Sequence, residues 1–241
     1  MSAIKEKYNK EIEAGMRPAE HPILFSTEMV KAILEGRKTM TRRVIKYSKK
    51  ITNPKIGFSA FTDKGEFEVR GVHENGQYGS SFFKMPFVKG DLLWVRESFA
   101  PGYFGYGSAA FKADWSFLAA EYVTEPKWKP SIHMPKEAAR IWLEITKVRA
   151  ERLQNISEED AIAEGVKSNF SALFQEQRYY DYMDIESEWR SAVSSFRSLW
   201  YKINGIESWH ENPWVWVIKY KVVSTTGKPE IVKTDELTIE N

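Results

Sequence analysis

A short basic segment, Gly36–Arg43, concentrates more reactive side chains than any other part of this chain. The seven residues after Gly36 include two threonine hydroxyls and four cations, namely Arg37, Lys38, Arg42 and Arg43. Positions 37–62 hold eight Lys or Arg and no Asp or Glu, whereas the whole chain carries a net charge of only +2. Such a local excess of positive charge favours an anionic partner. A solvated basic loop is the alternative explanation.

The elements on either side of this segment are expected to hold it in place. Ser26 and Glu28 predict the start of a short helix with an apolar stripe from Met29 to Leu34, and Gly36 suits its end. Residues 40–45 are compatible with a strand. The basic segment is therefore predicted to connect a helix end to a strand.

Gly36, Lys38, Thr41 and Arg43 fit the pattern G-x-K-x-x-T-x-R, which resembles the signature of the ASCH domain, a PUA-like barrel family. Three further segments resemble that family in the same order along the chain: Gly90–Val95, Leu153–Gly165, and the final stretch from Phe196–Trp200 to Asn212–Ile218. The final stretch is similar to that of longer ASCH proteins carried by phages and prophages. The resemblance touches roughly residues 22–45, 86–100, 128–166 and 196–220.

The resemblance implies an α+β fold, a small PUA-like (ASCH) β-barrel with flanking helices and insertions, in which the four segments form one barrel. We expect an N-terminal extension at 1–20, the ASCH/PUA-like domain at 21–223 with insertions near 46–85, 101–127 and 167–190, and a C-terminal tail at 224–241. Short separated strands with a few helices suit a small barrel better than a doubly wound sheet.

The resemblance also implies an activity, because similar ASCH proteins include amidohydrolases that remove the acetyl group from N(4)-acetylcytidine with a Lys, a Thr and a Glu. The matching residues are Lys38, Thr41 and Glu164. A threonine hydroxyl becomes a nucleophile when a base takes its proton, and a neutral lysine amine is such a base. Partial burial and Arg37, Arg42 and Arg43 would lower the pKa of Lys38 accordingly.

Glu164 would lie in the last turn of the helix that Ser157 begins and Gly165 ends, where the helix dipole disfavours negative charge. A protonated carboxyl there suits a general acid for the leaving amine. Arg43, or nearby backbone N–H groups, would hold the developing oxyanion. Arg42 is a further substrate-binding candidate.

Three points in this scheme stay open. In a fully extended chain Lys38 and Thr41 would point to opposite faces, so the segment must bend for them to meet. Thr39 is a second hydroxyl that only the family pattern demotes. Helical periodicity alone places Glu164 away from Ile162 and predicts that it faces solvent.

Other candidate residues have weaker support. Arg96 and Glu97 alternate along a predicted strand, so one of them can bind substrate inside the barrel or take part in an internal salt bridge. His133 is the one histidine in a family-like segment; the four histidines lack metal-ligand spacing, and no metal or cofactor is expected. Trp209, Trp214 and Trp216 would stack on a nucleobase or lie in the core.

Periodicity and turn residues place the remaining elements. We expect strands at 22–25, 92–99, 140–148 and 215–222, a hairpin at 58–69 around Asp63–Gly65, and a helix with the apolar series Trp189, Val193, Phe196, Trp200 and Ile203 that stops at Asn204. Pro135 would begin a short helix.

Composition narrows the functional classes. The chain has 241 residues and no cysteine, which excludes disulfides and thiol catalysis and fits a cytoplasmic protein. No apolar stretch reaches membrane-spanning length, and no secretory signal is evident. The leading function is hydrolysis of an acyl amide on a modified cytidine or related nucleoside. A non-catalytic RNA-binding module that uses the basic window Arg37–Lys55 and an ASCH-type ribonuclease are the alternatives. The oligomeric state is left open.

Overall fold

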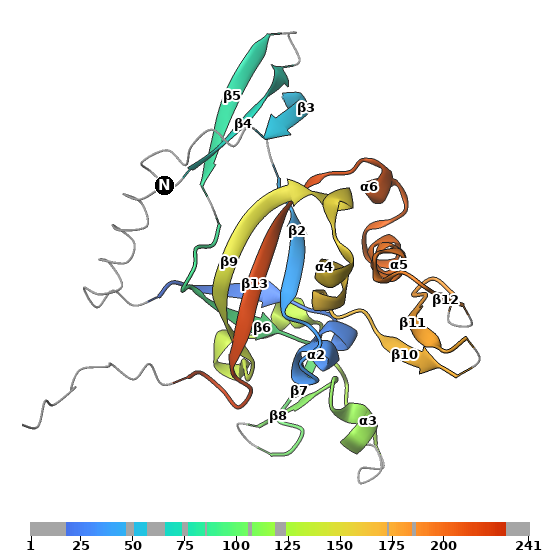
Figure 1. Cartoon of the computed structure of the whole chain (residues 1–241). Coiled ribbons are helices and arrows are strands. Elements are labelled where there is room, and N and C mark those ends of the chain that lie inside the picture. Colours follow the sequence, from blue (N-terminus) through green and yellow to red (C-terminus); the bar gives the residue numbers. More distant parts are fainter. Residues whose placement is uncertain are drawn as a thin grey trace, which may run out of the picture.

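The chain folds as a mixed α+β protein built around one five-stranded sheet (Figure 1). The computed structural model describes residues 18–46, 51–56, 66–73, 77–84, 86–105, 108–118, 124–172, 174–184 and 187–229.

The main sheet has the strand order β1-β6-β9-β13-β2. Strand β1 (Glu20–Leu24) runs parallel to β6 (Leu92–Arg96), and β6 is antiparallel to the long strand β9 (Trp142–Arg152). Strand β13 (Trp214–Ser224) is antiparallel to both β9 and β2 (Met40–Val44). Three of the four family-like segments therefore contribute the strands β2, β6 and β13 to a single sheet, and the fourth, Leu153–Gly165, contributes the helix Glu158–Ala163 and a backbone bridge from Glu164 to Lys38. Within the described residues β1 and β2 are its two edges, so hydrogen bonding between strands does not close it.

Helices cover both faces of this sheet (Figure 1). Helix α2 (Thr27–Leu34) begins at Ser26, whose hydroxyl accepts a hydrogen bond from the amide of Met29, and it buries Val30 and Ile33 with Phe25. On the opposite face α4 (Glu158–Ala163), α5 (Ala192–Asn204) and α6 (Glu207–His210) pack over Met40, Val215 and Val217.

The short segments around β6 and β9 form a third, smaller core. Two 3₁₀ helices, Ser131–His133 and Lys136–Ala138, bring Met134 and Ala139 against Trp142, and a further 3₁₀ turn, Leu153–Asn155, follows β9. Pro135 precedes the second of these helices, as expected.

Each expected insertion contains secondary structure of its own. Strands β3 (Ile51–Ile56), β4 (Glu66–His73) and β5 (Tyr78–Lys84) form one three-stranded sheet, which stands away from the main sheet in Figure 1. A two-stranded pair, β7 (Phe99–Pro101) and β8 (Ala109–Phe111), is followed by the short helix α3 (Trp115–Leu118). The third insertion holds β10 (Ser168–Ser171), β11 (Glu176–Tyr180) and β12 (Glu188–Trp189).

Most expected elements are present, with two differences. The apolar series from Trp189 predicts one helix, but α5 begins only after Ser191, whose hydroxyl accepts from the amide of Ser194, and Trp189 lies in β12. The second arm of the hairpin expected at 58–69 falls in β4, which pairs with β3 and β5. The first arm and the turn Asp63–Gly65 lie outside the described residues.

Candidate active site

Lys38 and Arg42 are the two buried cations of the basic segment. Lys38 is 2% exposed, and its ammonium donates to a carboxylate oxygen, Oε2 of Glu164, at 2.8 Å. It also donates to the carbonyls of Met40 at 2.8 Å and Glu164 at 2.9 Å. All three donors of the ammonium therefore have acceptors, as a buried charge requires.

The side chain of Lys38 extends towards β2, which brings its charged end close to the backbone of Thr41. Its ammonium reaches the carbonyl of Met40, which belongs to the peptide bond that joins Met40 to Thr41. The charged end of Lys38 thus lies beside the backbone of Thr41, although the two Cβ atoms need not share a face. Thr41 is itself buried, whereas Thr39 is exposed.

Glu164 is buried and not solvent-facing, so the prediction from helical periodicity was wrong. The residue is the C-cap of α4, and it forms a backbone bridge to Lys38. Gly165 follows with a φ of 88°, which turns the chain away from the helix. At a helix end the position of a side chain is set by this turn and by the bridge, since helical periodicity no longer applies there.

Gly165 also sets how closely the two segments approach. A Cβ atom at this position would lie 2.7 Å from Cβ of Lys38, which is closer than real Cβ contacts, and 3.1 Å from Cβ of Ala32, which is tighter than most. Arg37 adds a hydrogen bond from its guanidinium to the carbonyl of Gly165 at 2.6 Å. Only glycine satisfies both the backbone angle and the space here.

Arg42 links the Lys38–Glu164 pair to a wider ionic cluster. Its guanidinium is fully buried and donates to Glu164 at 3.1 Å, Glu151 at 2.6 Å and Asp160 at 2.8 Å. Arg149 donates to Oε2 of Glu151 at 2.8 Å and to Oδ2 of Asp160, the same oxygen that accepts from Arg42. We call this set the ionic cluster; its three cations and three carboxylates are Lys38, Arg42, Arg149, Glu151, Asp160 and Glu164. The cluster is neutral overall, and each of its ions is bonded to at least one ion of opposite charge, as buried ions require.

Burial is the main influence on Lys38, and it lowers the pKa of this amine below its ordinary value. The negative charge of Glu164 acts in the opposite direction, while Arg43 and Arg42 lower the pKa further. This direction agrees with the expectation, and burial is a larger cause of it than the neighbouring arginines. Arg37, which the sequence suggested as a contributor, pairs instead with Glu35 on the surface.

A small pocket of about 90 Å³ opens beside the ionic cluster. Thr41 and Glu164 both line it, together with Arg42, Arg43 and residues of α5 that include Phe196 and Trp200. Thr41 and Glu164 thus face one cavity, with the ammonium of Lys38 bound to the carboxylate behind it. The space is enough for an acyl group but too small for a whole nucleoside.

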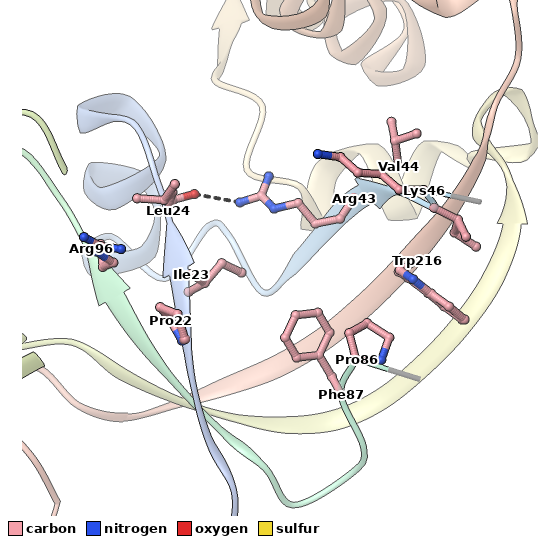
Figure 2. Close-up of a pocket in the computed structure, with 11 residues that line it drawn as sticks. Pro22, Ile23, Leu24, Arg43, Val44, Lys46, Pro86, Phe87, Arg96 and Trp216 are labelled. Atoms are coloured by element: carbon pink, nitrogen blue, oxygen red, sulfur yellow. Dashed lines mark hydrogen bonds between the residues drawn. The ribbon is translucent and has the colours of Figure 1, made fainter. Parts of the chain in front are cut away.

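A larger pocket of about 470 Å³ lies between the two edge strands of the sheet (Figure 2). Arg43 extends across it from β2 and donates to the carbonyl of Leu24 on β1 at 2.7 Å. Phe87 and Trp216 form apolar walls. The two pockets share Arg43 and Val44, so they adjoin along β2. Burial lowers the pKa of Arg43, opposed by Glu164.

The other expected site residues are separated from the ionic cluster. Arg96 lines the larger pocket. Glu97 instead forms a buried ion pair with Arg140, with Nε to Oε1 at 2.9 Å, which is the salt bridge of the two alternatives; burial raises the pKa of Glu97. His133 is exposed on its 3₁₀ helix and lines neither pocket.

The tryptophans divide between core and pocket. Trp209 packs with Phe196 in the core under α5, and Trp214 packs against the core that contains Phe25. Trp216 is 6% exposed and lines the larger pocket.

Sequence reasoning missed Tyr220 and Asp160. Tyr220 is buried on β13, and its hydroxyl has no hydrogen-bond partner among the described residues. Burial and the negative charge of Glu164 raise its pKa well above the ordinary value, so the phenol stays a neutral donor. A tyrosine that shares the apolar face of its strand with Trp216 and Ile218 was the available signal. No sequence signal pointed to Asp160, because an acid in the first turn of a helix is common.

Asp160→Asn should destabilise the protein by about 1.5–3 kcal/mol, the range for hydrogen bonds to charged groups. Despite the cost of burial, its bonds with Arg42 and Arg149 lower the pKa of Asp160. The unfolded chain therefore takes up a proton first as the pH falls below 3.8, and this contribution to stability is lost in acid. Urea unfolding at neutral and acid pH measures both effects.

Glu159→Gln is the matched control, since Glu159 is the exposed neighbour of Asp160 on the same helix. It should cost less stability than Asp160→Asn. If the two variants lose stability equally and keep the same decline in acid, Asp160 does not stabilise Arg42.

Comparison with known proteins adds no relative. The sequence matches no model of a known protein family and no curated protein, and the structure matches no solved structure.

Two further features of the described residues bear on the sequence expectations. They include no helix with the length and hydropathy that crossing a membrane demands. Nor do they bring three His, Cys, Asp or Glu side chains together as a metal-binding group.

Proposed function

We propose that this protein is an ASCH-type amidohydrolase with a PUA-like fold, which removes an acyl group from the amine of a modified cytidine or related nucleoside. The observation that carries the proposal is the buried Lys38–Glu164 pair at 2.8 Å, bordering a cavity that Thr41 also lines. Lys38 and Glu164 are 126 positions apart in the sequence. Lys38, Thr41 and Glu164 are the three residues that the family pattern picks out.

Lys38 is proposed as the general base and Glu164 as the general acid, and one shared proton connects the two roles. An ammonium beside a carboxylate and an amine beside a carboxylic acid contain the same number of protons, and they differ only in which side of a 2.8 Å hydrogen bond holds one. Burial favours the form without charges. In the proposed reaction this proton moves to Glu164, which creates a base and an acid together.

In the first half of the reaction, the Thr41 hydroxyl attacks the acyl carbonyl and gives its proton to the Lys38 amine. The carbon–nitrogen bond then breaks, and Glu164 protonates the departing amine. The products of this half are the free cytidine amine and an ester on Thr41. Arg43 lies at the junction of the two pockets, where its guanidinium can stabilise the oxyanion.

In the second half, water attacks the ester and gives a proton to the Glu164 carboxylate, while the ammonium of Lys38 returns its proton to the Thr41 oxygen. The carboxylic acid product leaves, and the neutral pair is restored. No residue other than Lys38 and Glu164 needs to change its charge.

The sizes of the two pockets suit two different parts of the substrate, the nucleoside and the acyl group. The larger one, about 470 Å³, falls within the range of roughly 300–1,000 Å³ that is typical of small-molecule sites. The smaller one suits the acyl group beside Thr41.

Replacement of Thr41 tests the proposal. Thr41→Val removes the hydroxyl and should abolish hydrolysis of N(4)-acetylcytidine, whereas Thr41→Ser keeps a hydroxyl and should retain measurable turnover. The release of cytidine, followed by chromatography, measures both. An active Thr41→Val enzyme would rule out the threonine nucleophile.

The alternative of a non-catalytic RNA-binding module is tested by the same preparation. Lys38 and Arg42 are buried and ion-paired, so they are unavailable to phosphates. We therefore expect RNA affinity, if any, to change modestly with salt, since each phosphate contact on a single strand contributes about −0.7 to the slope. A steep slope without turnover of any acylated cytidine would favour the binding module.

A further inference from the structure

We propose that the larger pocket binds a phosphate monoester, and that the substrate is an acylated cytidine mononucleotide and not the free nucleoside. This inference rests on the proposed function for the identity of the base, but the phosphate site stands on the pocket alone.

The pocket combines apolar walls with charge of one sign. Three cations line it, namely Arg43, Lys46 and Arg96, and no Asp or Glu is found among the described residues around it. Phe87, Trp216 and Ile23 supply the walls. Flat apolar surfaces with a few convergent charged groups are what a site for a small anionic ligand requires.

The structure separates the cations of the basic segment into two groups. Arg37, Lys38 and Arg42 each form an ion pair with a carboxylate of this chain. Arg43 and Lys46 line the larger pocket instead, and so does Arg96 from β6, whose guanidinium also donates to the carbonyl of Ile132 and lies over the ring of Trp94. The charge concentrated in the sequence is thus partly neutralised inside the protein, and the remainder borders one cavity.

A terminal phosphate monoester fits this arrangement better than a polynucleotide backbone. A monoester carries a charge of about −1.5 to −2 at pH 7 in one group. Lys46 and Arg96 line the same pocket as Arg43, which the proposed reaction uses at the oxyanion, and their two positive charges match such a concentrated negative charge. The pocket also lies between β1 and β2, with Arg43 bonded across to Leu24, so it is bounded on both sides (Figure 2).

Binding of the reaction products tests this site without turnover. Cytidine 5′-monophosphate should bind the wild-type protein roughly ten- to hundredfold more tightly than cytidine, as one or two charge-assisted hydrogen bonds would give. Titration calorimetry at low and high salt measures both ligands, and inorganic phosphate should compete with the nucleotide.

Two variants locate the phosphate. Lys46→Gln and Arg96→Gln should each reduce the preference for the nucleotide by about tenfold. Lys46 is exposed, so its replacement leaves the fold unaffected. Lys221→Gln is the matched control, because Lys221 is an exposed cation on β13 paired with Glu144 outside both pockets.

The outcomes separate this inference from the proposed function. Equal affinity for cytidine and its monophosphate would overturn the inference, even if the acylated nucleoside is hydrolysed. A nucleotide preference that depends on Lys46 and Arg96 would support it, even if no acylated cytidine is hydrolysed. Tighter binding of a cytidine within an RNA trinucleotide than of the mononucleotide would also overturn it.

Discussion

Replacing Lys38 with methionine should lower the rate of N(4)-acetylcytidine hydrolysis by about 10²–10⁴-fold, the usual contribution of a general base. Methionine has a similar length and no charge, so it fills the buried site and removes only the ammonium. Glu164 keeps its hydrogen bond from Arg42 at 3.1 Å, so its carboxylate is not left unpaired. Steady-state kinetics on folded protein, verified by circular dichroism, provides the measurement.

Lys38→Arg tests the same role differently. It keeps the charge but removes any group that becomes neutral near pH 7, so hydrolysis should again be lost. Because Lys38 is fully enclosed, the larger guanidinium should also cost stability through overpacking. Near-wild-type turnover by either variant would eliminate Lys38 as the base.

Gly165→Ala should destabilise the protein by about 2–5 kcal/mol, which combines backbone strain with overpacking. The strain arises because the φ of 88° is unfavourable for a residue with a Cβ atom, and the overpacking arises because this Cβ would lie 2.7 Å from that of Lys38. The added Cβ atom would push Lys38 away from the neighbouring Glu164 and so weaken their hydrogen bond. Activity should therefore fall as well. Denaturant unfolding gives the change in free energy.

Gly36→Ala is the control for the backbone effect. Gly36 has a φ of 74° but nothing within 4 Å of the added Cβ atom, so only the strain of roughly 1–2 kcal/mol should appear. Equal losses for the two alanine variants would show that the contact with Lys38 is unimportant.

Local sequence signals were sufficient for most of the fold. The caps Ser26 and Ser157 and the glycines Gly36 and Gly165 set the ends of two helices, because these residues satisfy or redirect the backbone at helix ends. The apolar run in β13 predicted a buried strand. The order of strands was beyond such reasoning, since β1 and β2 are neighbours in sequence but opposite edges of the sheet.

The candidate site shows a similar division. The family-like pattern picked out Lys38 and Glu164, and the structure brings them together. The full burial of Lys38 and the partners of Arg42 depend on contacts between residues more than 100 positions apart, which no periodicity reports. Tyr220 lies in the strand expected at 215–222, but its burial beside Phe25 depends on packing that the pattern of this strand does not report.

The position of β13 affects when the protein can acquire activity during synthesis. In the described sheet β2, which carries Thr41, is hydrogen-bonded to β13 alone, with Met40 opposite Lys219 and Val44 opposite Val215. A ribosome must therefore complete residues 214–224 before this strand gains a partner, although Thr41 is translated early. Nascent chains shorter than this should hold the basic segment outside any sheet and hydrolyse nothing, because long-range pairing cannot precede the arrival of its second strand.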